Sequence, residues 1–326
     1  MIRGAAQVPP FLEPRKASEK ALAAVIQEAW IGGASTRRVD ELAQAMGLGG
    51  ISKSTVSKLC KEIDERVGGS LERPLEGEWP YLWLDAAYLK VREVGRIVSV
   101  AAIVAVAVDA GGRREIVGLG LGPSEAEPFW SALLKGLVRR GLKGVRLVIS
   151  DAHEGLKHAA AKVLGATWQR CRVHWMRNAL AHVPKGQQTV VAAALRQAFL
   201  RPGRAAAGQA WRQLADQRRP RWPKLAALMD ESEPDVLADM GFPTQHRAKL
   251  HSTNPLERLN KELKRRADVV GIFPGEASIT RLIGAVLLEA NDEWQLQHRY
   301  MQLEAMAELL SPDAESEALR LPPLAA

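Results

Sequence analysis

The 326-residue chain is 47% hydrophobic, which is enough to bury a substantial core in two or three structural units. It contains no run of about 18 apolar residues and no recognisable signal peptide, so we expect a cytoplasmic protein without a membrane partner. Two cysteines are too few for a disulfide scaffold or a four-cysteine zinc site, and a net charge of +8 favours an anionic partner such as DNA, although a basic surface also aids solubility.

The first 70 residues show the spacing of three short helices. Ser18 can cap the first, a second is predicted over residues 35–46, and Ser52 can cap the third after the glycine-rich turn at 47–50. A glycine turn before the last of three helices predicts a helix-turn-helix, although any small helical bundle shows a similar pattern. Small polar and basic residues early in the third helix would then contact DNA: Lys53, Ser54, Thr55, Ser57 and Lys58.

The hydrophobic period changes to two after residue 80. Three strands with a tight turn between the last two are followed by a helix and a short buried strand: 81–91, 97–108, the turn 109–112, 113–121, 124–140 and 145–149. This order of elements is the opening of a ribonuclease H-like α/β unit. Beyond His153 nearly every segment has helical spacing, up to a final helix over 278–298.

Two aspartates occupy informative positions. Asp85 lies inside the first strand among apolar residues, and Asp151 follows the buried strand directly. A carboxylate within an apolar strand is costly unless it binds a cation or a hydrogen-bond donor. Mg²⁺ prefers such oxygen ligands, and two ions about 4 Å apart can drive an in-line phosphoryl transfer. For Asp151 taken alone, a cap or turn role is the favoured explanation, and it is less favoured for Asp85.

A third carboxylate is available in the segment 252–266, STNPLERLNKELKRR. If its leucines form the core stripe of a helix, a step of about 100° per residue places Glu257 and Asn260 on one flank and Glu262 on the other. Glu262 has an arginine one turn to either side, so an ordinary ion pair explains it, whereas Glu257 has a single lysine at that spacing. These neighbours favour Glu257 slightly.

The same helix carries five basic residues that could follow a DNA backbone beside the carboxylates: Arg258, Lys261, Lys264, Arg265 and Arg266. A basic run on a helix is usually only a solvated face. Its position next to a candidate metal ligand makes the two interpretations about equal.

Cys171 and His174 form a C-x-x-H pair. Such a pair could supply half of a zinc site, with His182 as a third ligand, but no second cysteine pair completes the pattern. Packing or hydrogen bonding near the carboxylates is the favoured interpretation. A Cys-His nucleophile pair is a rival, for which no orienting Asn or Asp stands out.

Several motifs together resemble those of the Mutator-type insertion-sequence transposases of bacteria, and the resemblance runs almost end to end. It is carried by LEPRKASEKAL, WPYLWLDAAYLKVRE, GRREIVGLGLGPSEAEPFW, RGLKGVRLVISDAHEGLKHA, WQRCRVHWMRNALAHVPK, STNPLERLNKELKRRADVVGIFP and LLEANDEWQLQHRYM.

The resemblance implies a DDE transposase, in which Asp85, Asp151 and Glu257 are the catalytic ligands of two divalent ions, Mg²⁺ or Mn²⁺. It settles the choice of Glu257 over Glu262. Cys171 and His174 match a family motif that looks like support for the active site, and Asn260 is assigned the same role. The implied reaction is metal-dependent cleavage at terminal inverted repeats, followed by attack of the freed 3′-OH on target DNA without a covalent enzyme intermediate.

The implied organisation is a helix-turn-helix segment over residues 1–70, a ribonuclease H-like catalytic domain over 71–310, a helical insertion at about 172–250 and a tail over 311–326. We expect a nucleoid-associated homo-oligomer on DNA. Relatives generally have additional residues ahead of LEPRK, so impaired recognition of inverted repeats is expected.

Two other functions compete with this interpretation: a truncated, non-catalytic regulator that binds inverted repeats, and a metal-dependent nuclease of the same fold. A further hypothesis is that Trp211 or Trp222 stacks on an unpaired base. Core packing is the favoured explanation for both tryptophans.

Overall fold

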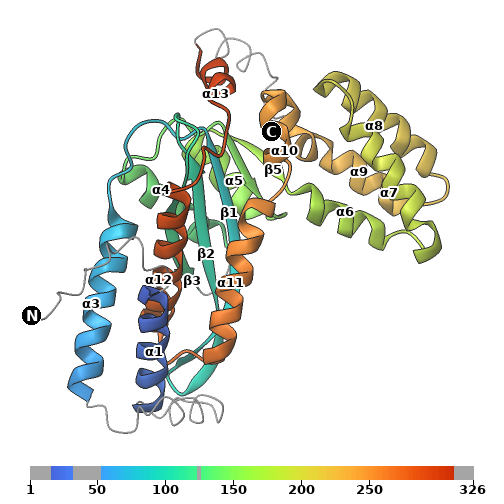
Figure 1. Cartoon of the computed structure of the whole chain (residues 1–326). Helices are drawn as coiled ribbons and strands as arrows, with labels where there is room; N and C mark the ends of the chain where they lie inside the picture. The colour runs from blue at the N-terminus through green and yellow to red at the C-terminus, as the bar shows by residue number, and fades with distance from the viewer. Residues whose placement is uncertain (1–15, 32–52, 123–125, 312–326) are drawn as a thin grey trace, which may run out of the picture.

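The computed structural model describes residues 16–31, 53–122 and 126–311. It is a mixed α/β fold with helices on both faces of a five-stranded sheet (Figure 1). The strands are β1 (Tyr81–Glu93), β2 (Arg96–Val108), β3 (Arg114–Gly122), β4 (Leu147–Ser150) and β5 (Thr167–Arg170). The helices are α1 (Lys16–Ile31), α3 (Lys53–Glu72), α4 (Glu127–Arg139), α5 (Glu154–Leu164), α6 (Arg172–Ala181), α7 (Lys185–Phe199), α8 (Arg204–Arg218), α9 (Pro223–Val236), the 3₁₀ helix η3 (Ala238–Gly241), α10 (Thr244–Leu250), α11 (Asn254–Val270), α12 (Glu276–Gln295) and α13 (Leu303–Leu310).

The sheet joins an antiparallel meander to two parallel strands, in the order β3-β2-β1-β4-β5. β1 pairs antiparallel with β2 and parallel with β4. Val94 and Gly95 join β1 to β2 and both have positive φ, 45° and 76°, as a type I′ turn requires. The four strands predicted from hydrophobic periodicity are confirmed. The sequence does not predict β5, because this strand is four residues long and mostly polar.

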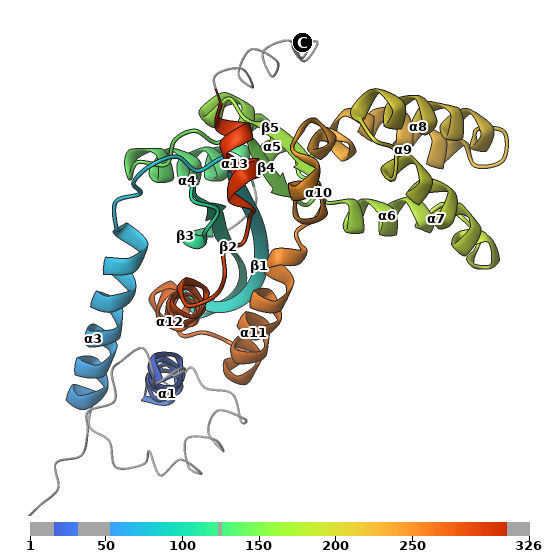
Figure 2. The same ribbon diagram turned by 45° about the horizontal axis from the view of Figure 1, so that its top comes forward.

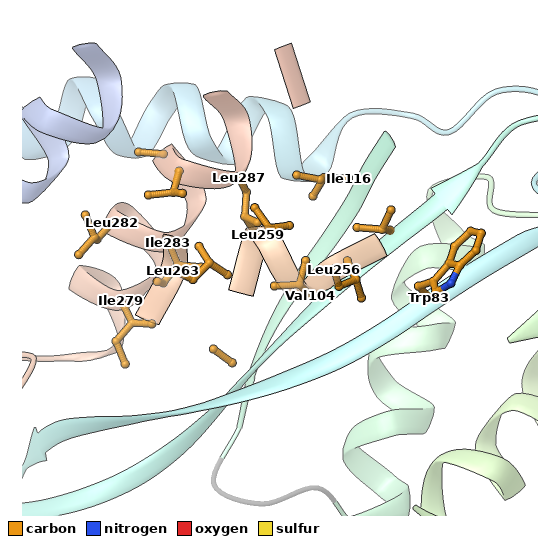
Figure 3. Close-up of a cluster of buried hydrophobic side chains, with 14 of the residues drawn as sticks. Trp83, Val104, Ile116, Leu256, Leu259, Leu263, Ile279, Leu282, Ile283 and Leu287 are labelled. Atoms are coloured by element: carbon orange, nitrogen blue, oxygen red, sulfur yellow. The ribbon is translucent and has the colours of Figure 1, made fainter. Parts of the chain in front are cut away.

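Successive residues of β1 face two different hydrophobic layers, because strand side chains alternate between the faces of a sheet. Trp83 and Leu89 belong to the core formed with α11 and α12, whereas Leu84 belongs to the core formed with α4 and α5. Figure 3 shows the first of these cores, in which leucines of α11 and α12 lie on one side of the sheet and Val104 of β2 lies beside Leu256 and Leu259. Asp85 has the parity of Trp83, so its side chain lies on the α11 side of the sheet.

Helices α6 to α9 form a bundle beside the sheet, with a hydrophobic core of its own (Figures 1 and 2). Trp211 is fully buried there, with its ring centroid 4.8 Å from that of Trp175 and its indole N–H donating to the Met229 carbonyl at 2.8 Å. The core-packing interpretation is therefore confirmed for Trp211, and base stacking by this residue is contradicted. Trp222 is half-buried, with two arginine side chains near its ring.

Helices α1 and α3 share the core of the sheet. Both pack against α12, and Val25 of α1 and Ile63 and Val67 of α3 are buried in the same cluster as Trp83. Helix α3 continues through residue 70 to Glu72, so the predicted domain boundary lies inside a helix. Within the three described ranges, no helix is long and apolar enough to cross a membrane.

The predicted second helix over 35–46 and the glycine turn at 47–50 lie outside the described residues. The helix-turn-helix therefore stays a prediction. Of its expected DNA contacts, Ser57 and Lys58 are exposed on α3. The other three belong to the first turn of α3, and their side chains lie outside what the structure describes: Lys53, Ser54 and Thr55.

Candidate active site

Asp85 and Asp151 are neighbours in the sheet. The parallel register pairs Trp83 of β1 with Ile149 of β4, and each aspartate lies two residues beyond that pair. Both therefore lie at the carboxyl end of β4. They line a single pocket of about 370 Å³, together with Tyr88 and residues of α4 and α5.

The carboxylate of Asp85 is held from two sides. Its Oδ2 accepts a hydrogen bond from the side-chain amide of Asn260 on α11, and its Oδ1 accepts one from the backbone N–H of Ala86 at 3.0 Å. The orientation of the carboxylate is therefore fixed by one side-chain donor and one backbone donor.

Burial raises the pKa of Asp85 above its usual 3.8. The adjacent backbone N–H acts in the opposite direction, the negative charge of Asp151 raises the pKa further, and the nearby His174 and Lys264 lower it. A partly buried carboxylate beside a second carboxylate is an environment that a bound cation would stabilise.

Asp151 is more exposed than Asp85 and lies against α6. Half of its side-chain surface, 51%, is accessible, and its Oδ1 lies 3.2 Å from the Nδ1 of His174. The same oxygen accepts a hydrogen bond from the backbone N–H of Ala152 at 3.2 Å. The histidine of the C-x-x-H motif therefore lies directly beside the second aspartate.

Cys171 contacts the start of α11 instead. It is fully buried, and its Sγ accepts hydrogen bonds from both the backbone N–H and the hydroxyl of Thr253, each at 3.4 Å. Its own N–H donates to the Ser150 carbonyl at 2.8 Å. Cys171 thus connects the end of β4 to the N-terminus of α11, whereas His174 contacts Asp151. The two side chains have different partners, and the third candidate zinc ligand, His182, is exposed at the end of α6.

The helical phase predicted for α11 is confirmed. Asn260 meets Asp85, whereas Glu262 on the other flank accepts hydrogen bonds from Arg265 and Arg266, both at 2.8 Å. Glu257 lies one turn before Asn260 and is exposed, with its Oε2 3.9 Å from the Nζ of Lys261. Among the residues that the structure describes, no three His, Cys, Asp or Glu side chains are grouped closely enough to hold a metal ion. Glu257 therefore does not join the two aspartates in the conformation described.

Four of the five basic residues predicted to follow DNA are exposed on α11: Arg258, Lys261, Lys264 and Arg265. The predicted DNA contact of the fifth, Arg266, is corrected by its burial. Arg266 is 6% exposed and its Nε donates to Glu262. Its guanidinium therefore stabilises the fold and does not face a DNA phosphate.

Sequence reasoning missed Thr253 and Tyr88. Thr253 is the N-cap residue of α11 and the partner of Cys171. The segment STNP at the start of the helix is a capping signal that could have indicated it. Tyr88 lines the aspartate pocket from β1, and only the packing of the sheet brings it to notice.

Comparison with known proteins agrees with the motifs. A family model described as "Transposase, Mutator family" matches residues 3–297. The chain is 42% identical over 298 residues to the transposase for insertion sequence element IS1081 of Mycobacterium tuberculosis, covering 91% of this chain and 72% of that protein. It is 40% identical over 305 residues to the transposase for IS406 of Burkholderia multivorans, covering 92% and 78%. It is 36% identical over 292 residues to the transposase for IS256 in transposon Tn4001 of Staphylococcus aureus, covering 88% and 74%. The chain therefore belongs to the Mutator family of transposases.

Proposed function

We propose that this transposase is a DDE enzyme that cleaves DNA at the terminal inverted repeats of an insertion sequence and joins the freed 3′ ends to target DNA. The observation that carries the proposal is the pairing of Asp85 with Asp151 at the carboxyl end of β4, beside the helix that bears Glu257. The antiparallel meander followed by two parallel strands supports a ribonuclease H-like catalytic core.

The donor set suits two divalent ions, Mg²⁺ or Mn²⁺, because carboxylate oxygens are the ligands that these ions prefer. Asp85 and Asp151 would hold them together with Glu257, whose carboxylate would have to turn away from Lys261. When bound, the ions would activate the attacking oxygen and stabilise the leaving oxygen of an in-line phosphoryl transfer.

The other side chains of the site position these carboxylates. Asn260 donates to Asp85 and keeps one carboxylate oxygen turned toward α11. His174 lies against Asp151, and Cys171 anchors the start of the helix that carries Glu257 and Asn260. The exposed lysines and arginines of α11 would bind the DNA backbone close to the reacting phosphate.

The test is cleavage of a duplex that carries the inverted repeat of the element, with and without Mg²⁺. Asp85→Asn, Asp151→Asn and Glu257→Gln should each lower the cleavage rate by about 10³-fold, since loss of a metal ligand removes several kcal/mol of transition-state stabilisation. Glu262→Gln is the matched control on the other flank of α11 and should retain the rate.

The competing functions give different results in the same assay. A non-catalytic regulator would bind the repeat and leave it intact, and a nuclease would cleave it without joining the 3′ end to a second DNA. An Asp85→Asn variant that cleaves at the wild-type rate would overturn the proposal.

A further inference from the structure

In the far half of the β1–β2 hairpin, one side packs on the core with α11 and α12 and the other carries exposed side chains. We define the hairpin face as the side chains of Tyr88, Lys90 and Arg92 on β1 and of Ile97 and Ser99 on β2. The register places Lys90 opposite Ser99 and Arg92 opposite Ile97, so these side chains share one side of the sheet. Tyr88, Lys90 and Arg92 lie an even number of residues from Leu84 on β1, so they are on the side of the sheet that faces α4 and α5.

Helices α4 and α5 do not extend over this part of the hairpin, which continues past them in Figure 1. Tyr88 is 58% exposed and Ile97 is 53% exposed, Lys90 and Ser99 are also exposed, and Arg92 is half-buried. On the opposite side, Leu89, Val91 and Val100 are buried in the core with α11 and α12. Next to the turn the exposure extends to both sides, because Glu93 and Arg96 on the opposite side are exposed as well.

The hairpin face is positively charged and borders the pocket that Asp85 and Asp151 line, while the Asp85 carboxylate itself turns to the α11 side of β1. Its five residues include two cations and no carboxylate. Tyr88 lines the same pocket as Asp85 and Asp151. Through this pocket a polymer bound at the carboxylates can reach the hairpin face on the other side of β1, and that face presents no acidic side chain to it.

The dimensions suit a DNA backbone. At about 3.3 Å per residue, the seven steps from Asp85 to Arg92 span about 23 Å, which is the rise of about seven nucleotides at 3.4 Å each. Lys90 and Arg92 project from one side of the strand about 7 Å apart, so they can contact phosphates in succession. Tyr88 provides a flat amphipathic ring between these cations and the carboxylates.

We propose that the hairpin face binds the sugar-phosphate backbone of the DNA that continues from the reacting phosphate. This inference rests on the proposed function, because it takes the Asp85–Asp151 pocket as the place of reaction. It adds a DNA-binding surface separate from α3 and α11. A second copy of the chain is the other possible occupant, but lysine is depleted in the cores of protein–protein interfaces.

The first test measures duplex binding by fluorescence anisotropy in EDTA. Without divalent metal there is no cleavage, so the assay reports the contribution of the hairpin face to DNA affinity alone. The Lys90→Gln/Arg92→Gln variant removes two charges while keeping polar side chains. It should lower the slope of log Kd against log salt by about 1.8, so the change in Kd between about 50 and 200 mM salt becomes roughly 12-fold smaller. Lys135→Gln/Arg139→Gln removes two exposed cations from α4 and should leave the slope unchanged.

The second test places a photo-crosslinker on the hairpin face. Both native cysteines, Cys60 and Cys171, are buried, so a Ser99→Cys variant can be labelled selectively. Labelled Ser99→Cys should crosslink to the duplex, whereas Val138→Cys on the exposed side of α4 should not. Circular dichroism of the two variants would verify that the hairpin and the helix remain folded.

An unchanged salt slope in the hairpin variant, or crosslinks from Ser99→Cys to protein in place of DNA, would overturn the inference. In either case Mg²⁺-dependent cleavage by the wild-type chain would still stand for the proposed function. Conversely, a duplex that is bound through the hairpin face but never cleaved would count against the proposed function and support the DNA-binding face.

Discussion

Glu262 accepts hydrogen bonds from Arg265 and Arg266, and these hold the pKa of Glu262 at about 2. Arg266 is buried, so the charge of its guanidinium depends on this partner. Glu257 has no such task, because its nearest cation is the exposed Lys261 at 3.9 Å. Two glutamates on one helix thus differ in what they stabilise.

We predict opposite effects for the two glutamine substitutions. Glu262→Gln should lower the free energy of unfolding by about 1–3 kcal/mol, because a charged hydrogen-bond acceptor is lost, and should retain cleavage. Glu257→Gln should leave stability within about 0.5 kcal/mol, as expected for an exposed residue, and lower the cleavage rate by about 10³-fold. Urea unfolding and the cleavage assay measure the two quantities separately. Equal losses of cleavage in both variants would contradict the assignment of Glu257.

His246 joins α10 to the first strand. Its Nδ1 lies 2.8 Å from the hydroxyl of Tyr81, and burial lowers the pKa of His246 below its usual 6.5, with the charge of Lys249 acting in the same direction. The folded state therefore binds this proton less readily than the unfolded state. The stability contributed by the neutral ring is complete above about pH 6.5 and decreases as the pH falls below it.

The corresponding prediction concerns the pH dependence of unfolding. The wild-type free energy of unfolding should fall between about pH 7 and pH 5 by more than that of His246→Gln, with a difference of at most about 1.4 kcal/mol per pH unit. Parallel curves for the two proteins would show that His246 titrates alike in the folded and unfolded states. Urea titrations at fixed ionic strength provide the comparison.

At the scale of elements, the site depends on how α11 begins. Thr253 is its N-cap residue, and the Sγ of Cys171 accepts hydrogen bonds from both the N–H and the hydroxyl of Thr253. The preceding residue, Ser252, accepts the indole N–H of Trp83 with its carbonyl at 3.2 Å. The helix that carries Glu257 and Asn260 is thus tied to β1 and to the start of α6 before its first turn.

We predict that Cys171→Ala lowers stability by about 1–3 kcal/mol, since it leaves two buried donors without their acceptor. It should also slow cleavage at temperatures well below its Tm, because the position of α11 loosens. Cys171→Ser retains an acceptor and should restore part of the rate. The discriminating readout is the Mg²⁺ concentration at half-maximal rate, which should rise in the alanine variant if α11 positions a metal ligand. An unchanged Mg²⁺ dependence would indicate a purely structural contact.

Periodicity predicted the elements that are long or strongly apolar, and it missed the short ones. The meander, β4 and the phase of α11 follow from alternation and from the leucine stripe. β5 was missed because Gln169 is a polar residue buried in a strand, satisfied by an N–H of Asp239 at 2.7 Å and by the Val236 carbonyl at 3.1 Å. These partners come from distant segments, so no local pattern reveals the strand. The short helices α10 and α13 were not predicted, because helices of seven and eight residues are too short to show a clear hydrophobic period.

The candidate site also has a part that the sequence predicts and a part that it does not. Asp85 and Asp151 could be predicted because each interrupts or ends an apolar strand. The contact between His174 and Asp151 and the contact between Cys171 and Thr253 join residues far apart in the chain. They depend on how α6 and α11 leave the sheet, which spacing does not specify.

At the scale of the whole molecule, the chain has a sheet with two cores and a helical bundle with a third. The bundle is attached through η3 and the end of β5, where the buried Asp239 forms an ion pair with Arg172 and its N–H donates to Gln169. Lys157 on α5 adds a second link through Asp235 at 2.8 Å. A bundle with its own hydrophobic core can open separately from the sheet.

This separation leads to a prediction for Trp211. Trp211→Ala should cost the bundle about 3–5 kcal/mol, because it removes a fully buried indole that packs on Trp175 and donates to Met229. Amide hydrogen exchange should accelerate in α6 to α9, while β1 and β2 keep wild-type protection. Trp222→Ala is the control, since this ring is only half-buried, and should change exchange little in either region. Equal loss of protection in the sheet would mean that the bundle and the sheet unfold as a single cooperative unit.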